Sequence, residues 1–253
     1  PYEELREIGI LALEKVGVPP ADARTTLEIL LCADLRGVGT HGIQRLLMYI
    51  PKIRKGLMNP RPKIDVRSPA PGLRLVAGDD GLGPVVGARG MSEAIELAKT
   101  AGVGFVGCSD SNHFSAAAPY VLMACRNRLI GIAGTNAFPT MPPSGGLGNI
   151  IGNNPLAIGV PCEGAPPFVL DIAMSVSARG RMRDMARKNE KMPEGWAVDK
   201  QGNPTTDPLE GLKGFVLPMG QHKGYGLAIA IDIIAGVLTG SGFATGVKSL
   251  VQQ

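Results

Sequence analysis

The sequence predicts an α/β fold that follows a small helical unit. Apolar residues recur at helical spacing through the first 56 residues, and short alternating or apolar runs typical of strands begin near residue 63. From there, strand-like and helix-like segments alternate with mostly short connections, which favours the α/β class. A chain of 253 residues, 44% hydrophobic and 19% charged, can bury a large core. We therefore expect a helical unit over residues 1–60 and an α/β domain over residues 61–253.

Prolines and glycines mark the ends of the expected N-terminal helices. The first helix is expected over residues 2–16 and stops at Gly17. Pro19 and Pro20 open the second helix, which runs to Leu35. The third is expected from Thr40 to Lys55, with Pro51 bending it and Gly56 ending it.

The later part of the chain alternates between the two kinds of element. Strands are expected over residues 63–67, 73–77, 103–108, 129–135, 156–161 and 168–173, and helices over residues 84–100, 116–126, 176–188 and 224–238. A loop rich in proline and glycine fills residues 138–154, and a turn at 201–207 precedes the last helix.

Composition narrows the possible partners and the cellular location. The net charge of +4 is mild, and no basic stripe interleaved with aromatic residues is present, so we do not expect nucleic-acid binding. No signal-like N-terminus or long uninterrupted apolar run occurs, which argues against a membrane segment. The four cysteines are far apart and lack CxxC spacing, and three of them lie in apolar runs, which favours reduced, buried thiols in a cytoplasmic protein.

The stretch DLRGVGTHGIQR, residues 34–45, is the first candidate site. Thr40 stands where a helix N-cap is expected, and His41 and Arg45 would share one face of that helix, four residues apart. An imidazole can carry a proton near neutral pH, and a guanidinium can grip a carboxylate. This pair would suit a 2-oxo or 2-hydroxy acid, although a histidine at a helix start is also commonly an ordinary capping or surface residue.

The other two histidines also fall between a loop and a helix. His113 follows an expected strand, at the edge where ligands of α/β sheets collect, and His222 precedes the last helix. Turn or cap roles remain open for both. None of the three histidines has a ligand partner at helical spacing, so we expect no metal site.

Two further stretches are candidates for orienting a side chain or binding a cofactor. Asp171 ends an expected strand, so its carboxylate can orient an imidazole, meet a cofactor hydroxyl or cap the next helix. Lys223, beside Gly224 at a helix start, can meet a phosphate. By contrast, Gly81-Leu82-Gly83 only partly matches a dinucleotide-binding glycine loop, because Val86 replaces the third glycine. We interpret these glycines as turn residues.

Taken together, several stretches resemble the malate/L-lactate dehydrogenase family that is unrelated to the Rossmann lactate dehydrogenases. The family includes ureidoglycolate and sulfolactate dehydrogenases, 2,3-diketogulonate reductase and cyclic imino-acid reductases. The resemblance is carried by DLRGVGTHGIQR, SNHF at 111–114, GNNPLAIGVP at 152–161, LDIAMSVSARGR at 170–181, WAVDKQGNPTTDP at 196–208 and HKGYGLAIAIDIIAGVLTG at 222–240.

The resemblance implies a non-Rossmann NAD(P)-binding α/β fold, usually assembled as a homodimer, that transfers hydride between NAD or NADP and a small 2-oxo/2-hydroxy acid. His41 would exchange a proton with the substrate, Arg45 with Thr40 would bind the substrate, and His113 and Asp171 would complete the catalytic set. The cofactor would contact Asp171, Ile172, Ala173, Met174, Ser175, His222, Lys223 and Gly224. Two alternatives stay open: an NADPH-dependent cyclic imine carboxylate reductase, and a truncated homologue that binds cofactor without catalysis.

The chain departs from the family pattern in two ways. The family usually has an acid and a serine before the histidine, where this chain has Gly39 and Thr40. Threonine keeps the hydroxyl, whereas loss of the carboxylate would alter substrate choice or the pKa of His41. The family also usually continues well beyond Gln253, so we expect either an incomplete sequence or a shortened form.

Overall fold

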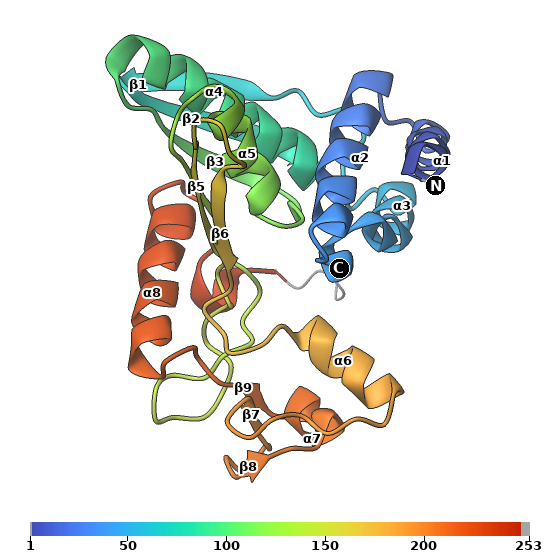
Figure 1. The fold of residues 1–253 in the computed structure, drawn as a ribbon, viewed down its shortest axis with the longest axis vertical. Coiled ribbons are helices and arrows are strands. Elements are labelled where there is room, and N and C mark those ends of the chain that lie inside the picture. Colours follow the sequence, from blue (N-terminus) through green and yellow to red (C-terminus); the bar gives the residue numbers. More distant parts are fainter. Residues whose placement is uncertain (1, 249–253) are drawn as a thin grey trace. The chain divides into compact units, whose positions relative to one another are not determined.

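The computed structural model describes residues 2–248 and divides them into two compact units (Figure 1). The first unit comprises residues up to 133 together with 157–171, and the second comprises residues 134–156 and those from 172 onward. The α/β class is confirmed. The expected boundary at residue 60 stays a prediction, and both expected domains include end residues, 1 and 249–253, that lie outside the described part.

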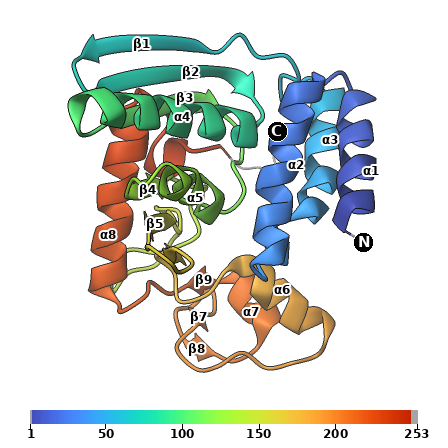
Figure 2. The same cartoon turned by 45° about the horizontal axis from the view of Figure 1, so that its top comes forward.

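Three helices form the N-terminal part of the first unit, α1 (Tyr2–Glu14), α2 (Pro20–Leu35) and α3 (Leu46–Arg54). They lie side by side in Figure 2, and their shared core includes Leu13, Leu27, Leu30 and Tyr49, all fully buried. Pro20 occupies the first turn of α2, where its missing N–H costs nothing. The first two helices were predicted closely because proline and glycine mark their ends.

The third helix begins later than the sequence predicted. Residues 39–41 and 43–45 form two separate 3-10 turns, and α3 starts only at Leu46. Gly42 between the turns is extended, and the Asp34 carboxylate accepts a hydrogen bond from the Ile43 N–H at 2.7 Å. The prediction that Thr40 caps a helix shared by His41 and Arg45 is therefore wrong. The Asp34 side chain of α2 accepts the Ile43 N–H at the point where that helix would have continued.

The rest of the first unit contains two sheets. Strands β1 (Asp65–Ala70), β2 (Leu73–Gly81) and β3 (Phe105–Ser111) pair in that order, β1 antiparallel and β3 parallel to β2. The crossover helix α4 (Gly83–Ala101) ends at Gly102, whose φ of +80° suits glycine. The second sheet has the order β4 (Gly131–Gly134), β5 (Leu156–Val160) and β6 (Phe168–Ile172).

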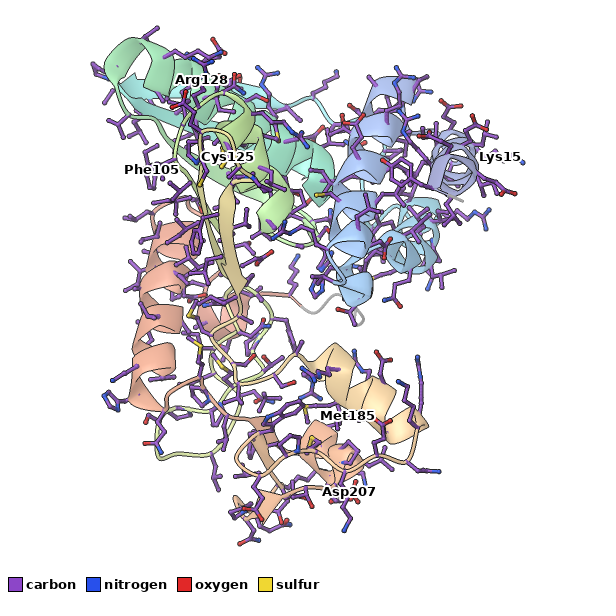
Figure 3. The ribbon with its side chains drawn as sticks, in the orientation of Figure 1. Lys15, Phe105, Cys125, Arg128, Met185 and Asp207 are labelled. Atoms are coloured by element: carbon purple, nitrogen blue, oxygen red, sulfur yellow. The ribbon has the colours of Figure 1, made fainter. Side chains whose placement is uncertain are left out.

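Helix α5 (Ala118–Arg126) packs against the second sheet of the first unit. Val121 and Ala117 of α5 share a buried cluster with Ala157 of β5. A side chain at Gly159 would come within 2.9 Å of the sulfur of Cys125, which Figure 3 labels, so this strand needs glycine at the contact. Cys125 is buried, whereas Cys162 is exposed, so burial of the thiols is less uniform than their apolar surroundings suggested.

The second unit contains helices α6 (Arg179–Arg187), α7 (Pro208–Lys213) and α8 (His222–Asp232), with α8 continuing into a π-helical turn over residues 233–237. A small antiparallel sheet has the order β8 (Pro204–Thr205), β7 (Ala197–Val198) and β9 (Phe215–Val216). The sequence did not predict α7 or β9, and it placed a turn where β8 lies. Asp207, labelled in Figure 3, caps α7 by accepting the Leu209 N–H at 2.7 Å. Within residues 2–248, no helix has the length and apolar character that a bilayer span requires.

Candidate active site

The 3-10 turns before α3 hold the partly buried side chains of His41 and Arg45 through a tight packing arrangement. Gly42 lies so close to Asp34 that an added Cβ would stand 1.8 Å from one carboxylate oxygen. This contact lets the Asp34 carboxylate reach the Ile43 N–H and fix the turn. Thr40 places its hydroxyl oxygen 3.0 Å from Nδ1 of His41, so it contacts the imidazole instead of a helix end.

His113 lies in the loop that follows β3. The Asn112 side chain donates to the Asp80 carbonyl at 2.8 Å, which holds the start of this loop. Gly83, at the start of α4, lies so close that a Cβ there would come within 2.3 Å of the His113 carbonyl oxygen. The Gly81-Leu82-Gly83 glycines thus allow close backbone approach beside the histidine loop.

The two loops bring His41 and His113 together. Their rings are nearly parallel, 23° apart, with centroids separated by 5.6 Å. Tyr49 of α3 places its hydroxyl oxygen 2.9 Å from Nδ1 of His113 and 3.0 Å from the His113 carbonyl. The Ser115 hydroxyl donates to the His41 carbonyl at 2.6 Å, which joins the loops directly.

Burial and positive charge make both imidazoles neutral at pH 7. Burial, followed by the charge of Arg45, lowers the pKa of His41 to about 4. The same two causes, with smaller effects of His41 and Lys52, hold the pKa of His113 well below its usual value. The charge of Arg45 therefore reaches both rings, although His41 and Arg45 do not share an α-helical face as the sequence analysis expected.

Hydrogen bonding indicates which nitrogen of His113 carries the proton. The Ser115 backbone N–H donates to His113 Nδ1 at 3.3 Å, and a backbone N–H can only donate. Nδ1 is the acceptor in this contact, which favours the tautomer of the neutral ring that carries its proton on Nε2. The cluster combines a neutral base, a neutral N–H donor and a guanidinium, which is a set suited to proton exchange on an anionic substrate.

Asp171 stabilises the start of α5. Its Oδ2 accepts the Ala118 N–H at 2.8 Å, so Asp171 caps α5, which precedes it in the sequence, and not the next helix, as the sequence analysis had left open. Burial raises the pKa of Asp171, and the hydrogen bond from Ala118 partly offsets this rise. A contact of this carboxylate with substrate or cofactor stays a prediction.

The expected cofactor segments of the second unit lie next to each other. The Met219 N–H donates to the Met174 carbonyl at 2.8 Å, and Ser175 forms a bridge with Pro218. Gly224 fits tightly here, since a Cβ would lie 2.8 Å from the same Met174 carbonyl. The segment that contains Met174 and Ser175 therefore lies beside the start of α8 at Gly224, and the binding of a cofactor by these residues stays a prediction.

The chemistry of this junction fits an anionic cofactor. His222 and Lys223 are exposed at the first turn of α8, where the helix N-terminus favours a phosphate. The Ser177 hydroxyl, two residues beyond Ser175, is buried and has no hydrogen-bond partner among the described residues. These groups could hold the phosphate and hydroxyl groups of a dinucleotide. Within residues 2–248, no group of three metal-ligating side chains converges.

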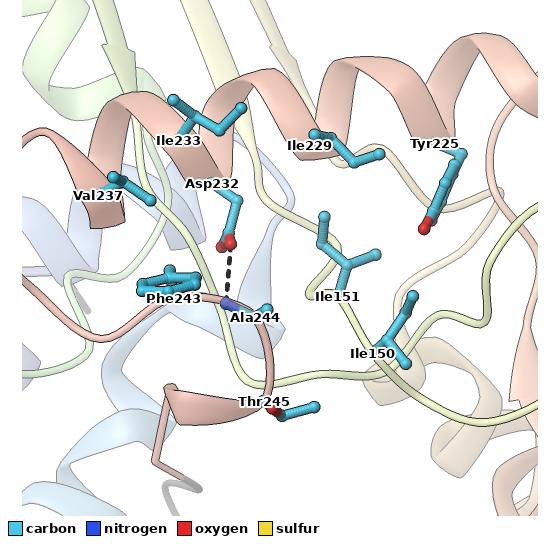
Figure 4. Close-up of a pocket in the computed structure, with 10 residues that line it drawn as sticks. All are labelled: Ile150, Ile151, Tyr225, Ile229, Asp232, Ile233, Val237, Phe243, Ala244 and Thr245. Carbon is cyan, nitrogen blue, oxygen red and sulfur yellow. Dashed lines mark hydrogen bonds between the residues drawn. The ribbon is translucent and has the colours of Figure 1, made fainter.

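A separate apolar groove of about 450 Å³ lies along α8 (Figure 4). Its walls include Ile151, Ile229, Ile233 and Phe243. The Asp232 carboxylate accepts the Ala244 N–H at 2.8 Å, which fastens the segment after the π turn to the helix. The groove contains none of the residues predicted to be catalytic or to bind substrate or cofactor.

Tyr49 and Ser115 belong to the histidine cluster but were not predicted from the sequence. Tyr49 stands four residues after Arg45, and this spacing was the only signal that could have pointed to it. Nothing local marks Ser115, because its partner His41 lies 74 residues away in the sequence.

Comparisons with known proteins agree with these features. The family model for malate/L-lactate dehydrogenase matches residues 1–253. Malate dehydrogenase of Pyrococcus horikoshii is 42% identical, over 100% of this chain and 72% of its own length. The NAD(+) ureidoglycolate dehydrogenase of Escherichia coli O157:H7 is 37% identical over 98% of this chain and 70% of its own. The NADP(+) (2R)-3-sulfolactate dehydrogenase of Chromohalobacter salexigens is 35% identical over 95% and 72%.

Solved structures show the same relationship. Sulfolactate dehydrogenase from Methanocaldococcus jannaschii superposes with a TM-score of 0.93 at 42% identity, covering 98% of this chain and 72% of that one. Delta1-piperideine-2-carboxylate reductase from Pseudomonas syringae pvar. tomato superposes with a TM-score of 0.93 at 28% identity, over 99% and 76%. With a family model that matches the whole sequence and relatives above 30% identity, this chain belongs to the malate/L-lactate dehydrogenase family.

Proposed function

We propose that the protein is an NAD(P)-dependent oxidoreductase that interconverts a small 2-hydroxy acid and the corresponding 2-oxo acid. The observation that carries this proposal is the pair of neutral, stacked imidazoles of His41 and His113 under the charge of Arg45. Family membership and the names of the dehydrogenases it resembles support the same reaction class.

His41 is proposed to exchange the proton. In the oxidative direction, the neutral imidazole accepts the hydroxyl proton while the C2 hydrogen leaves with its electron pair as hydride. In reduction, the protonated ring returns that proton to the carbonyl oxygen. Thr40, whose hydroxyl is 3.0 Å from His41 Nδ1, orients the ring and contributes to substrate binding.

Arg45 is proposed to bind the substrate carboxylate and thereby to tune His41. Burial is the larger cause of the low pKa of His41, and the charge of Arg45 is the smaller one. A carboxylate paired with the guanidinium offsets that charge, so substrate binding removes the part of the pKa shift that Arg45 causes. His113 would donate from Nε2 to the substrate oxygen.

The cofactor is proposed to bind the residues that the second unit brings together, Ile172–Ser175 and His222–Gly224, with Asp171 at the preceding position. NAD or NADP, when bound, supplies or accepts the hydride. The exposed Lys223 and the α8 N-terminus provide positive potential for its phosphates. A cytoplasmic location and a homodimeric assembly are part of the proposal and are supported by the family resemblance.

The test is a panel of 2-oxo acids, including pyruvate, oxaloacetate and sulfopyruvate, with NADH and with NADPH. We expect loss of absorbance at the nicotinamide band with at least one pair, and loss of this activity in His41→Ala with cofactor affinity unchanged. No turnover with any pair, together with undiminished cofactor binding, would favour a non-catalytic homologue.

A cyclic imine carboxylate is the second candidate substrate. It is favoured by the structural likeness to the piperideine-2-carboxylate reductase, since Arg45 and His41 would serve a carboxylate beside an imine equally well. Adding such imines to the panel separates the two, because the leading proposal predicts a higher kcat/KM for the 2-oxo acid.

A further inference from the structure

A single serine connects the two histidine loops in an uncommon backbone conformation. Ser115 has φ of +72°, in the left-handed region that disfavours residues with a Cβ. It is also 4% exposed, so its polar groups need partners inside the protein. A strained, buried residue persists only where its surroundings hold it in place.

Both polar groups of Ser115 contact the histidine pair. The hydroxyl donates to the carbonyl of His41 at 2.6 Å, across 74 residues of sequence. The backbone N–H donates to Nδ1 of His113 at 3.3 Å. One residue therefore fixes the main chain of the first histidine and the ring of the second, and the two rings stack 5.6 Å apart.

The place of the His41 carbonyl explains why such a contact is needed. His41 is the last residue of the first 3-10 turn, and the extended Gly42 separates that turn from the next. The carbonyl thus lies at a break in the local hydrogen bonding. The Ser115 hydroxyl donates the hydrogen bond that the His41 carbonyl would otherwise need to receive from water.

We propose that Ser115 is a positioning residue that clamps the His41 loop to the His113 loop through its left-handed backbone and its hydroxyl. It orders the two imidazoles before substrate binds. The effect that we expect on kcat rests on the proposed function. The left-handed conformation aims the N–H at His113, while the hydroxyl reaches His41. Both bonds require the residue to stay in this conformation.

The test compares Ser115→Ala with Ser115→Gly in the full chain. Alanine loses the hydroxyl and keeps the strained Cβ, whereas glycine loses the hydroxyl and adopts the left-handed region freely. The clamp therefore predicts that Ser115→Gly is more stable than Ser115→Ala although both lose the link to His41. Thr26→Val is the matched control, because Thr26 is buried and donates to the Asp22 carbonyl at 2.7 Å within α2.

Imidazole NMR gives a readout that does not need activity. The chain has three histidines, so three sets of ring signals are expected. Loss of the clamp shifts the signals of His41 and His113 in both Ser115 variants and leaves those of His222 unchanged, while Thr26→Val shifts none. Unchanged His41 and His113 signals in Ser115→Gly would overturn the proposal, even if Ser115→Ala failed to fold.

Kinetics give the second readout. Both Ser115 variants should lower kcat about tenfold or more, since displacing a reacting group by a fraction of an ångström is costly, and cofactor affinity should not change. Full kcat in Ser115→Gly would overturn the clamp. If the wild-type protein is inactive but the His41 and His113 signals still shift in the Ser115 variants, the proposed function is refuted and the clamp is retained.

Discussion

Replacing Gly42 by alanine tests how the His41 turn is held. The new Cβ would lie 1.8, 2.1 and 2.3 Å from Oδ1, Cγ and Oδ2 of Asp34. The cheapest relief is rotation of the Asp34 side chain, which breaks its 2.7 Å hydrogen bond from the Ile43 N–H. We therefore expect the mutation to damage the turn through one specific carboxylate.

The magnitude follows from the bond that is lost. A hydrogen bond to a charged group contributes about 1.5–3 kcal/mol, and residual crowding adds about 1 kcal/mol or more. We expect Gly42→Ala to lower the free energy of unfolding by about 3 kcal/mol. Because His41 and Arg45 flank the change, kcat should fall on the order of tenfold to a hundredfold.

Urea unfolding and steady-state kinetics provide the assay, and the chain offers a matched control. A Cβ at Gly39 would meet Asp34 only at 3.6 Å, an ordinary contact, so Gly39→Ala should change stability by less than about 1 kcal/mol. In Asp34→Ala/Gly42→Ala, the Asp34 carboxylate that would clash with the new Cβ is absent, so the double mutant should be no less stable than Asp34→Ala alone. If the stability losses of the two single mutants add in the double mutant, the clash with Asp34 is not the cause.

Three further predictions concern the neighbouring groups. His41 has a folded pKa of about 4 against an ordinary 6.5, so its contribution to stability is complete above pH 6.5 and is lost as the pH falls towards 4. At about 1.4 kcal/mol per pKa unit, the loss is about 3 kcal/mol. The free energy of unfolding in urea, plotted against pH over this range, should have a shallower slope in His41→Asn than in wild type; identical slopes would contradict this. Tyr49→Phe removes the hydroxyl beside His113, so we expect a loss of about 1 kcal/mol and a lower kcat; His113 ring signals that stay in place would count against this contact. Asp171→Ala should cost about 1 kcal/mol from the lost cap on α5, and Asp171→Asn should restore it; if Asn restores stability but not turnover, the carboxylate also acts in the reaction.

Local pattern was enough to predict most regular elements of this fold. Pro20 and Gly17 mark the boundary between α1 and α2 in sequence as clearly as in structure. Helix α4 was also predicted closely, over residues 84–100, and Pro84 lies in its first turn. The strands of the small sheet in the second unit have only two residues each, too few to show a period, and for this reason β8 and β9 were missed. Helix α7 has six residues, too few to show a clear helical repeat.

Residue chemistry pointed to part of the histidine cluster, but its geometry could not be predicted from the sequence. His41, Arg45 and His113 could be chosen because their side chains carry the chemistry. The turn that holds them depends on Asp34, nine residues before Ile43, and on Ser115, which lies far along the chain. Contacts of this kind leave no periodic signal, so the sequence predicted a continuous helix where the structure has two 3-10 turns.

In the proposed reaction, His41 carries the proton while hydride is transferred to C2 of the substrate. This role is tested most directly with cofactor deuterated at C4 of the nicotinamide and mass spectrometry of the product formed by wild type and His41→Asn. We expect deuterium at C2 of the wild-type product and a loss of about a hundredfold or more in the rate for His41→Asn, with the same cofactor affinity. Equal rates of deuterium transfer in the two proteins would contradict it.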